Sequence, residues 1–109
     1  MIGLISLILY NITFSIEPDI EREWLGYMRK QYVPEVLATG KFIKCTLFRL
    51  LGETADSDST FALQFTAENL GEVQSYLDRF APGITERHMA RFRHKHVAFM
   101  TLLESVDLS

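Results

Sequence analysis

Residues 8–16, ILYNITFSI, alternate in side-chain character with a period of two. This is the pattern of a β-strand, whose successive side chains point to opposite faces of a sheet. Glu17-Pro18-Asp19 comes next and favours a helix, because proline fits the first helical turn and acidic groups complement the helix dipole. Apolar residues then follow at helical spacing, namely Ile20, Trp24, Tyr27 and Met28. The chain therefore opens with a strand and an amphipathic helix.

The next residues predict the end of this helix and a hairpin. Pro34 lacks an amide hydrogen and clashes with the preceding turn, so the helix must bend or restart there. Gly40 supplies the left-handed residue that commonly ends a helix. Residues 42–51 and 60–66 have strand character, and the acidic, serine-rich segment between them suits a hairpin loop.

A second helix and a last strand complete the pattern. The helix is marked by Leu70, Val73, Leu77 and Phe80, is interrupted at Ala81-Pro82, and continues through Ile84, His88 and Phe92. Residues 97–106 predict the final strand. The order β-α-β-β-α-β indicates an α+β, ferredoxin-like domain, a four-stranded antiparallel sheet with both helices on one face. We expect a single domain over residues 1–109, with residues 1–6 as an irregular extension.

Both faces of the predicted strands are largely uncharged. A sheet with one face in water normally alternates apolar and polar residues, so the face without helices should be covered by another chain. We therefore predict a homodimer, a dimeric α+β barrel. On the second strand we place Phe42, Phe48 and Leu50 on one face and Ile43, Cys45, Leu47 and Leu51 on the other. Our candidates for the dimer interface are Leu9, Arg49, Met100 and Leu102.

Composition limits the possible partners and compartment. A formal net charge of −3 argues against nucleic-acid binding, which needs a basic face. A single cysteine, Cys45, excludes an intramolecular disulfide and suits a reducing compartment. The apolar start of the chain lacks the basic region and cleavage site of a signal peptide and is too short to cross a bilayer. We expect a cytoplasmic protein without nucleic-acid or membrane partners.

Several motifs together resemble a small bacterial family of unknown function. They are LYNITFSI, W-x-x-Y-M, Y-V-P-E-V-L-A-T-G-K-F, L-F-R-L-L and the closing VAFMTLLE. The most specific is P-E-V-L-A-T-G. The family is similar in layout to dimeric α+β barrels, a group that includes cofactor-free monooxygenases, haem-degrading enzymes and effector domains of transcription regulators. One fold hosts all of these activities, so the resemblance implies a fold and no particular chemistry. Two features depart from it, the extra residues before Ile8 and the absence of a monooxygenase motif.

His88 is the strongest candidate for a functional side chain, because it lies near the apolar stripe of the second helix. The resemblance to haem-degrading barrels pairs a histidine on this helix with an asparagine on the first strand, here Asn11. The two-residue period of the strand, however, places Asn11 on the face of the sheet opposite Tyr10. Our candidate ligand pocket comprises His88, Trp24, Asn11, Tyr10 and Met28. We favour a structural histidine, satisfied by a local partner, over a catalytic one.

Other polar groups have simpler interpretations. The basic run of residues 86–96, ERHMARFRHKH, could hold an anion, but cations also collect at helix C-termini to complement the dipole.

His94 and His96 lack a third ligand nearby, so we expect no metal site, and we expect no cofactor. Cys45 has no paired base and fits a small buried apolar residue. Arg49 needs a carboxylate if it is buried, and Glu104, across the dimer interface, is one candidate.

Two classes of function remain open from the sequence. One is a homodimeric module that binds a small hydrophobic ligand or another partner. The other is a cofactor-independent or haem-handling enzyme of the monooxygenase type. An open pocket lined by His88 and Trp24 would favour the enzyme, and a filled interior would favour the module. We favour the module, because no nucleophile, metal set or phosphate loop is visible.

Overall fold

The computed structural model describes residues 6–52, 57–93 and 95–109. The predicted order of strands and helices is confirmed, with each helical region divided into shorter pieces. The expected extension at residues 1–6 lies outside the described residues except for Ser6. The elements are β1 (Ile8–Ile16), η1 (Pro18–Ile20), α1 (Glu21–Tyr27), η2 (Met28–Tyr32), α2 (Val33–Ala38), β2 (Lys44–Arg49), β3 (Ser59–Ala67), α3 (Leu70–Arg79), α4 (Ala81–Arg91) and β4 (His96–Glu104).

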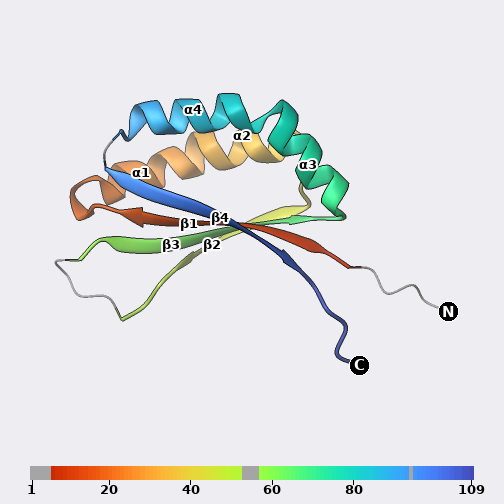
Figure 1. Cartoon of the computed structure of the whole chain (residues 1–109). Helices are drawn as coiled ribbons and strands as arrows, with labels where there is room; N and C mark the ends of the chain where they lie inside the picture. Colours follow the sequence, from red (N-terminus) through yellow and green to blue (C-terminus); the bar gives the residue numbers. More distant parts are fainter. Residues whose placement is uncertain (1–5, 53–56, 94) are drawn as a thin grey trace.

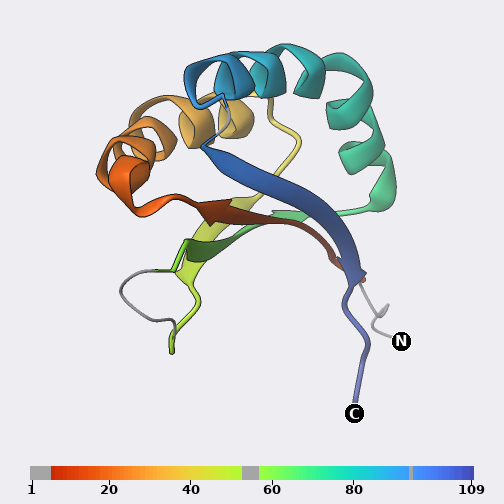
Figure 2. The same cartoon turned by 60° about the vertical axis from the view of Figure 1, so that its left-hand side comes forward.

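The four strands form one antiparallel sheet in the order β2-β3-β1-β4. All the helices lie on one face of this sheet, and the other face carries none (Figures 1 and 2). The ferredoxin-like fold predicted from the sequence is therefore confirmed. No helix in the described part of the chain is long and apolar enough to span a bilayer.

The core lies between the sheet and the helices. Alternate residues of β1 point into it, as the sequence pattern predicted, and each is less than one-tenth exposed: Ile8, Tyr10, Ile12, Phe14 and Ile16. The middle of β3 adds three buried side chains, Phe61, Leu63 and Phe65. The helices contribute Trp24, Met28, Tyr32, Val36, Val73, Tyr76, Ile84 and His88, and Phe92 follows directly after α4. Sequence periodicity did not single out Tyr32 and Tyr76 as core residues.

The first helical region accommodates Pro34 through one wide turn. The segment η2 is a π-helix, in which the amide of Val33 donates to the carbonyl of Met28, five residues back. Pro34 then occupies the first turn of α2, where a missing amide hydrogen costs nothing. The helical path is therefore continuous through Pro34, and one π-turn takes the place of the bend or restart that the sequence predicted. Gly40 ends it with φ 76°, in the left-handed region, and its amide donates to the carbonyl of Leu37.

Two expectations about β2 require correction. The strand begins at Lys44 and not at residue 42, and Phe42 therefore does not share a face with Phe48. Phe42 is buried beside Tyr10 and Tyr76, whereas Phe48 is half exposed on the other side of the sheet. The paired register of β2 with β3 begins at Lys44, so the two-residue alternation of the strand does not extend back to Phe42.

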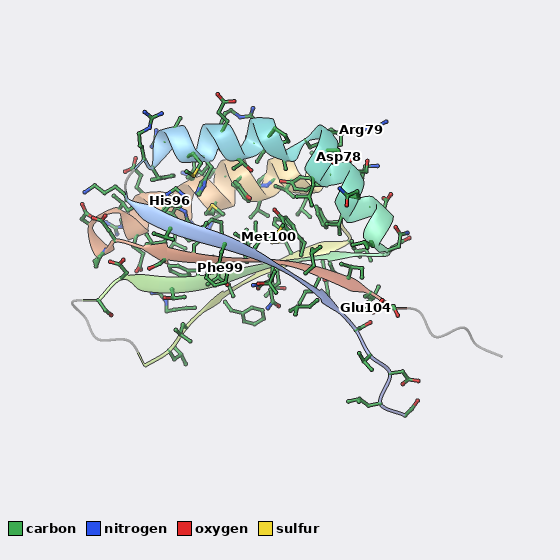
Figure 3. The ribbon with its side chains drawn as sticks, viewed as in Figure 1. Asp78, Arg79, His96, Phe99, Met100 and Glu104 are labelled. Atoms are coloured by element: carbon green, nitrogen blue, oxygen red, sulfur yellow. The ribbon has the colours of Figure 1, made fainter. Side chains whose placement is uncertain are left out.

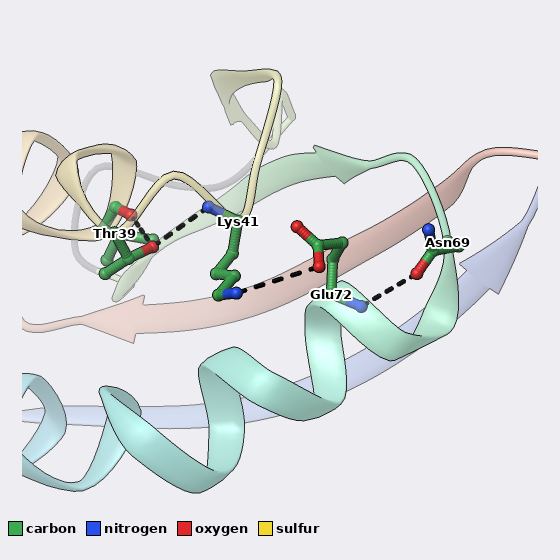
Figure 4. Close-up of polar contacts among 5 residues, drawn as sticks. Thr39, Lys41, Asn69 and Glu72 are labelled. Carbon is green, nitrogen blue, oxygen red and sulfur yellow. Dashed lines mark hydrogen bonds and ion pairs between the residues drawn. The ribbon is translucent and has the colours of Figure 1, made fainter.

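Asn69 caps the second helical region. Its side-chain Oδ1 accepts a hydrogen bond from the amide of Glu72 at 3.0 Å, and Glu72 also lies 3.9 Å from Lys41 (Figure 4). Leu70, one of the residues that mark this helix in the sequence, is 53% exposed. Phe80 breaks the helix with φ −116°, and α4 restarts with Pro82 in its first turn.

Candidate functional site

His88 and Trp24 meet in the core between α4 and α1. The indole Nε1–H of Trp24 donates a hydrogen bond to Nε2 of His88 at 2.9 Å. An imidazole that accepts at Nε2 is neutral and carries its proton on Nδ1. His88 is 3% exposed, and burial lowers the pKa of its ring to about 4, with the adjacent His96 adding to the effect. His88 is thus held neutral as a hydrogen-bond acceptor.

Aromatic rings fill the space around His88. Their centroids lie between 4.6 and 6.4 Å from that of His88. The rings belong to Phe14, Trp24, Tyr27, Tyr32, Phe92 and His96. This packing leaves the imidazole in contact with side chains of its own domain.

His96, at the start of β4 (Figure 3), is the nearest ionisable neighbour of His88. Its Nδ1 lies 3.1 Å from the carbonyl oxygen of Phe92, and since a carbonyl only accepts, this nitrogen donates. Within the described parts of the chain no three histidine, cysteine or carboxylate side chains are grouped to hold a metal ion. His94, part of the motif considered for metal binding, lies outside the described residues.

The predicted pocket residues do not all line one space. Asn11 lies on the face of the sheet opposite Tyr10, so the two side chains are separated by the sheet itself. Tyr10 packs with Phe42 and Tyr76, and burial raises the pKa of its phenol to about 12. Only Trp24 and His88 are hydrogen-bonded to each other.

A small apolar cavity lies between the first helical region and β2. It has a volume of about 270 Å³. Cys45 lines it and is half-buried, and burial raises the pKa of its thiol to about 11. A protonated thiol behaves as a small apolar group, but Cys45 is half-buried where the sequence favoured a buried position. The other lining residues are Leu25, Met28, Arg29, Val33, Leu47 and Leu63.

Within its own chain Arg49 is paired with Glu21, whereas the pairing with Glu104 was considered across the dimer interface and stays a prediction. Its guanidinium lies 3.0 Å from Oε2 of Glu21 and 4.7 Å from the ring centre of Phe61. Hydrogen bonds from Arg49 and Ser59 lower the pKa of Glu21. Arg49 therefore lies on the helix-bearing side of the sheet. Glu104 is on β4, at the opposite edge of the sheet from β2.

The basic run at the end of α4 makes ion pairs with the first helical region. Arg87 pairs with Glu35, and Arg91 lies 2.6 Å from Glu23. Lys95 lies 3.1 Å from Asp19 and 3.5 Å from Glu17. These cations thus join two helical regions that are distant in sequence. Exposed ion pairs of this kind contribute about 0–1 kcal/mol each.

The sheet face without helices, called the open face below, is apolar at its edges. The register assigns to it the odd-numbered residues of β1 and the strand residues paired with them. Phe48, Val97, Phe99 and Leu103 on this face are 51%, 68%, 61% and 46% exposed. Among the described strand residues of the open face, only Lys44 is charged.

The interface candidates lie on two sides of the sheet. Leu9 is on the open face, whereas Met100 and Leu102 pair with Ile12 and Tyr10 and therefore point to the helix side. They remain 48% and 41% exposed, because the helices do not cover β4 (Figure 3). Arg49 is on the helix side at the opposite edge. Of the four candidates, only Leu9 therefore has its side chain on the open face.

Solved structures similar to this chain share its fold at low sequence identity. A NIPSNAP family protein from Agrobacterium tumefaciens has 12% identity and a TM-score of 0.69 over 100% of this chain and 94% of its own. SnoaB, a cofactor-independent oxygenase from Streptomyces nogalater, has 14% identity and a TM-score of 0.65 over 97% of both chains. A dimeric ferredoxin-like protein from an uncultured marine organism has 6% identity and a TM-score of 0.66 over 95% of this chain and 99% of its own. Likeness at this level shows the fold alone.

Sequence comparison defines the family. No curated protein sequence matches the chain. A family model described as a domain of unknown function, DUF4286, matches residues 7–106, which span β1 to the end of β4. The resemblance to a small family of unknown function is thereby confirmed, and the chain belongs to the DUF4286 family.

Proposed function

We propose that the protein works as a homodimer whose two sheets pack through their open faces, and that this dimer binds a small apolar ligand. The observation that carries the proposal is the uncovered sheet, with four large apolar side chains on the open face about half exposed or more. Burying such a side chain contributes about 1.5–3 kcal/mol. Their sum is comparable with the net stability of a domain, about 5–15 kcal/mol.

A second copy of the chain is the partner that this surface fits best. A twofold interface must be complementary to itself, and an almost uncharged face meets that condition without repulsion. One protein with this fold is described as dimeric. We expect the dimer to bury roughly 1,200 Å² or more in total.

The cavity beside β2 is the place we propose for the ligand. Its wall is apolar, with Cys45 held protonated and Arg29 as the single charged residue. At about 270 Å³ it is near the lower limit of ligand pockets, roughly 300 Å³, which restricts the ligand to a small molecule.

An oxygenase is the alternative suggested by the description of SnoaB. A general base must reach the proton that it removes. In this protein the imidazole of His88 is enclosed by aromatic rings, and its Nε2 is occupied by Trp24. These contacts support a structural histidine, and we therefore favour the binding module.

The dimer can be tested with one substitution and a matched control. Phe99→Lys places a charge on the open face, whereas Met89→Lys places one on the outer side of α4, where Met89 is similarly exposed at 50%. By sedimentation velocity, Phe99→Lys should give monomers and Met89→Lys should remain dimeric. Dimers in both variants would place the interface elsewhere and overturn the proposal.

A further inference from the structure

The two edge strands of the sheet each have one side without a neighbouring strand. In the order β2-β3-β1-β4, β2 pairs with β3 alone and β4 with β1 alone, among the residues that the structure describes. Every residue of β4 after His96 is exposed. A long, apolar edge strand is a surface on which another strand can pair, and folded proteins usually cover it.

Each edge also carries an incomplete apolar surface on the helix side. At one edge, Met100 and Leu102 of β4 are 48% and 41% exposed, and packing of the open faces alone would leave them in water. At the other edge lies the cavity beside β2. Its wall residues Cys45 and Leu47 are half-buried, whereas Leu63 in the same cavity is completely buried.

The register places these two surfaces at the same level of the sheet. Across the four strands, Cys45 is level with Leu102, through Phe65 and Tyr10. Two residues further along, Leu47 is level with Met100. All of these side chains point to the helix side.

Twofold symmetry can bring the two edges together. An axis that runs between the facing sheets, parallel to the strands, sets β4 of one chain beside β2 of the other. A rotation moves nothing along its own axis, so residues at the same level meet. Since β2 and β4 run in opposite directions, the two edges meet as antiparallel strands and can close the sheets into a barrel.

The charges of the edge strands favour this axis over one perpendicular to the strands. A perpendicular axis would set β2 against the partner's β2, and both charged residues of β2, Lys44 and Arg49, are cations. The parallel axis instead brings Lys44 to the end of the partner's β4, where Glu104 is one residue from the same level. Opposite charges stabilise a strand pair, and like charges destabilise it.

We propose that β4 of each chain pairs with β2 of its partner, so that Met100 and Leu102 complete the wall of the partner's cavity beside β2. This inference rests on the homodimer and the ligand cavity proposed above. Each ligand site then contains side chains of both chains, and a monomer holds only part of a site. Methionine and leucine add apolar, adaptable surface, which suits an uncharged apolar molecule.

An introduced cysteine tests the strand pairing, because Cys45 is the only cysteine of the chain. Facing residues of antiparallel strands have Cβ atoms about 4.5–5.5 Å apart, close to the separation in a disulfide. Leu102→Cys, oxidised with copper phenanthroline, should therefore give a covalent dimer of twice 12.6 kDa on a non-reducing gel. Met89→Cys, similarly exposed at 50% but on the outer side of α4, is the control and should not cross-link.

Three results would overturn the pairing while the homodimer stands. The first is a dimer in sedimentation velocity that Leu102→Cys does not cross-link. The second is a cross-link that persists when Cys45→Ala is added, which would set β4 against the partner's β4. The third is a cross-link through Met100→Cys in place of Leu102→Cys, which would shift the two strands by two residues. A monomeric natural protein would overturn the homodimer and the pairing together.

The shared ligand site has a separate readout, with indole as the probe. Indole binding is followed through the protection of Cys45 from a thiol reagent, at concentrations where sedimentation velocity shows dimers. Leu102→Ala should raise the indole concentration for half protection about three- to tenfold, and the control Met89→Ala should change it less than about twofold. An unchanged value for Leu102→Ala, or no protection in the natural dimer, would overturn the shared site, and the cross-link alone would then decide the strand pairing.

Discussion

His88 connects the two helical regions across the core at the scale of a single residue. Its neutral ring accepts the indole proton of Trp24, which would otherwise be a buried donor without a partner. Tyr32 and Phe92 contribute further contacts around the ring. Protonation would remove the acceptor at Nε2 and place a charge in an apolar environment.

This arrangement predicts a specific acid sensitivity. The pKa of His88 is about 4 in the folded protein and 6.5 in an unfolded chain, so below pH 6.5 the unfolded state binds a proton that the folded state does not. The free energy of unfolding should therefore be independent of this group above pH 6.5 and fall by about 3 kcal/mol as the pH decreases to 4. Urea unfolding between pH 7 and pH 5 measures the effect before the lowered pKa of Glu21 contributes.

His88→Gln is the control for this prediction. The glutamine side chain offers an acceptor for Trp24 but does not titrate. The variant should lose the decrease in stability between pH 6.5 and pH 5. The same decrease in variant and natural protein would assign it to another group.

Cys45 offers a direct test of the cavity beside β2. A pKa of about 11, against a reference value of 9.0, leaves about a hundredfold less thiolate at pH 8 than in an unfolded chain. Labelling with a thiol reagent should be at least about tenfold slower in the folded protein than in urea. A small apolar probe such as indole should slow it further if it occupies the cavity, and an unchanged rate at saturating probe would argue against binding there.

Individual residues were only partly predictable from the sequence. Helical spacing was sufficient to place Trp24 and His88 in the core, but the hydrogen bond between them depends on how α1 and α4 pack. The ion pair of Arg49 with Glu21 was not predicted, because it depends on how α1 packs beside β2. The basic run was assigned to the helix dipole, since no local pattern indicates the acidic partners on the first helical region.

At the scale of elements, the π-turn before Pro34 preserves a continuous helical path. It brings Met28 and Tyr32 into the core on either side of the wide turn. The sequence predicted a restart at Pro34 but gave no sign of a π-helix, because the choice between a bend and a wide turn depends on packing. The two-residue period correctly predicted which side chains of β1 face the core, because the whole strand is paired on both sides. The same period gave the wrong face for Phe42, because Phe42 precedes the paired part of β2.

Gly40 and Gly26 form a matched pair for testing how the first helical region ends. Gly40 has φ 76°, and a methyl group there would contact nothing within 4 Å, so the cost of Gly40→Ala is purely conformational. It should lower the free energy of unfolding by about 1 kcal/mol. Gly26 lies inside α1 with equal space around it, so Gly26→Ala should raise stability by roughly 0.5–1 kcal/mol. Changes of the same sign in both variants would contradict this account.

At the scale of the whole molecule, the sheet has one face covered by helices and one face without them (Figure 1). The sequence indicated this imbalance, because both faces of its strands are largely uncharged while only two helical regions are available to cover them. It did not show that β4 extends beyond the helices and leaves Met100 and Leu102 exposed on the helix side as well. That result depends on the strand order and on the length of β4.

Sedimentation equilibrium of the unmodified protein at micromolar concentration tests the homodimer most directly. We predict a mass of about 25 kDa, twice the 12.6 kDa of one chain. The mass should be insensitive to added salt, because the open face is almost uncharged. A single species of 12.6 kDa across the concentration range would contradict the central claim that two sheets pack through their open faces.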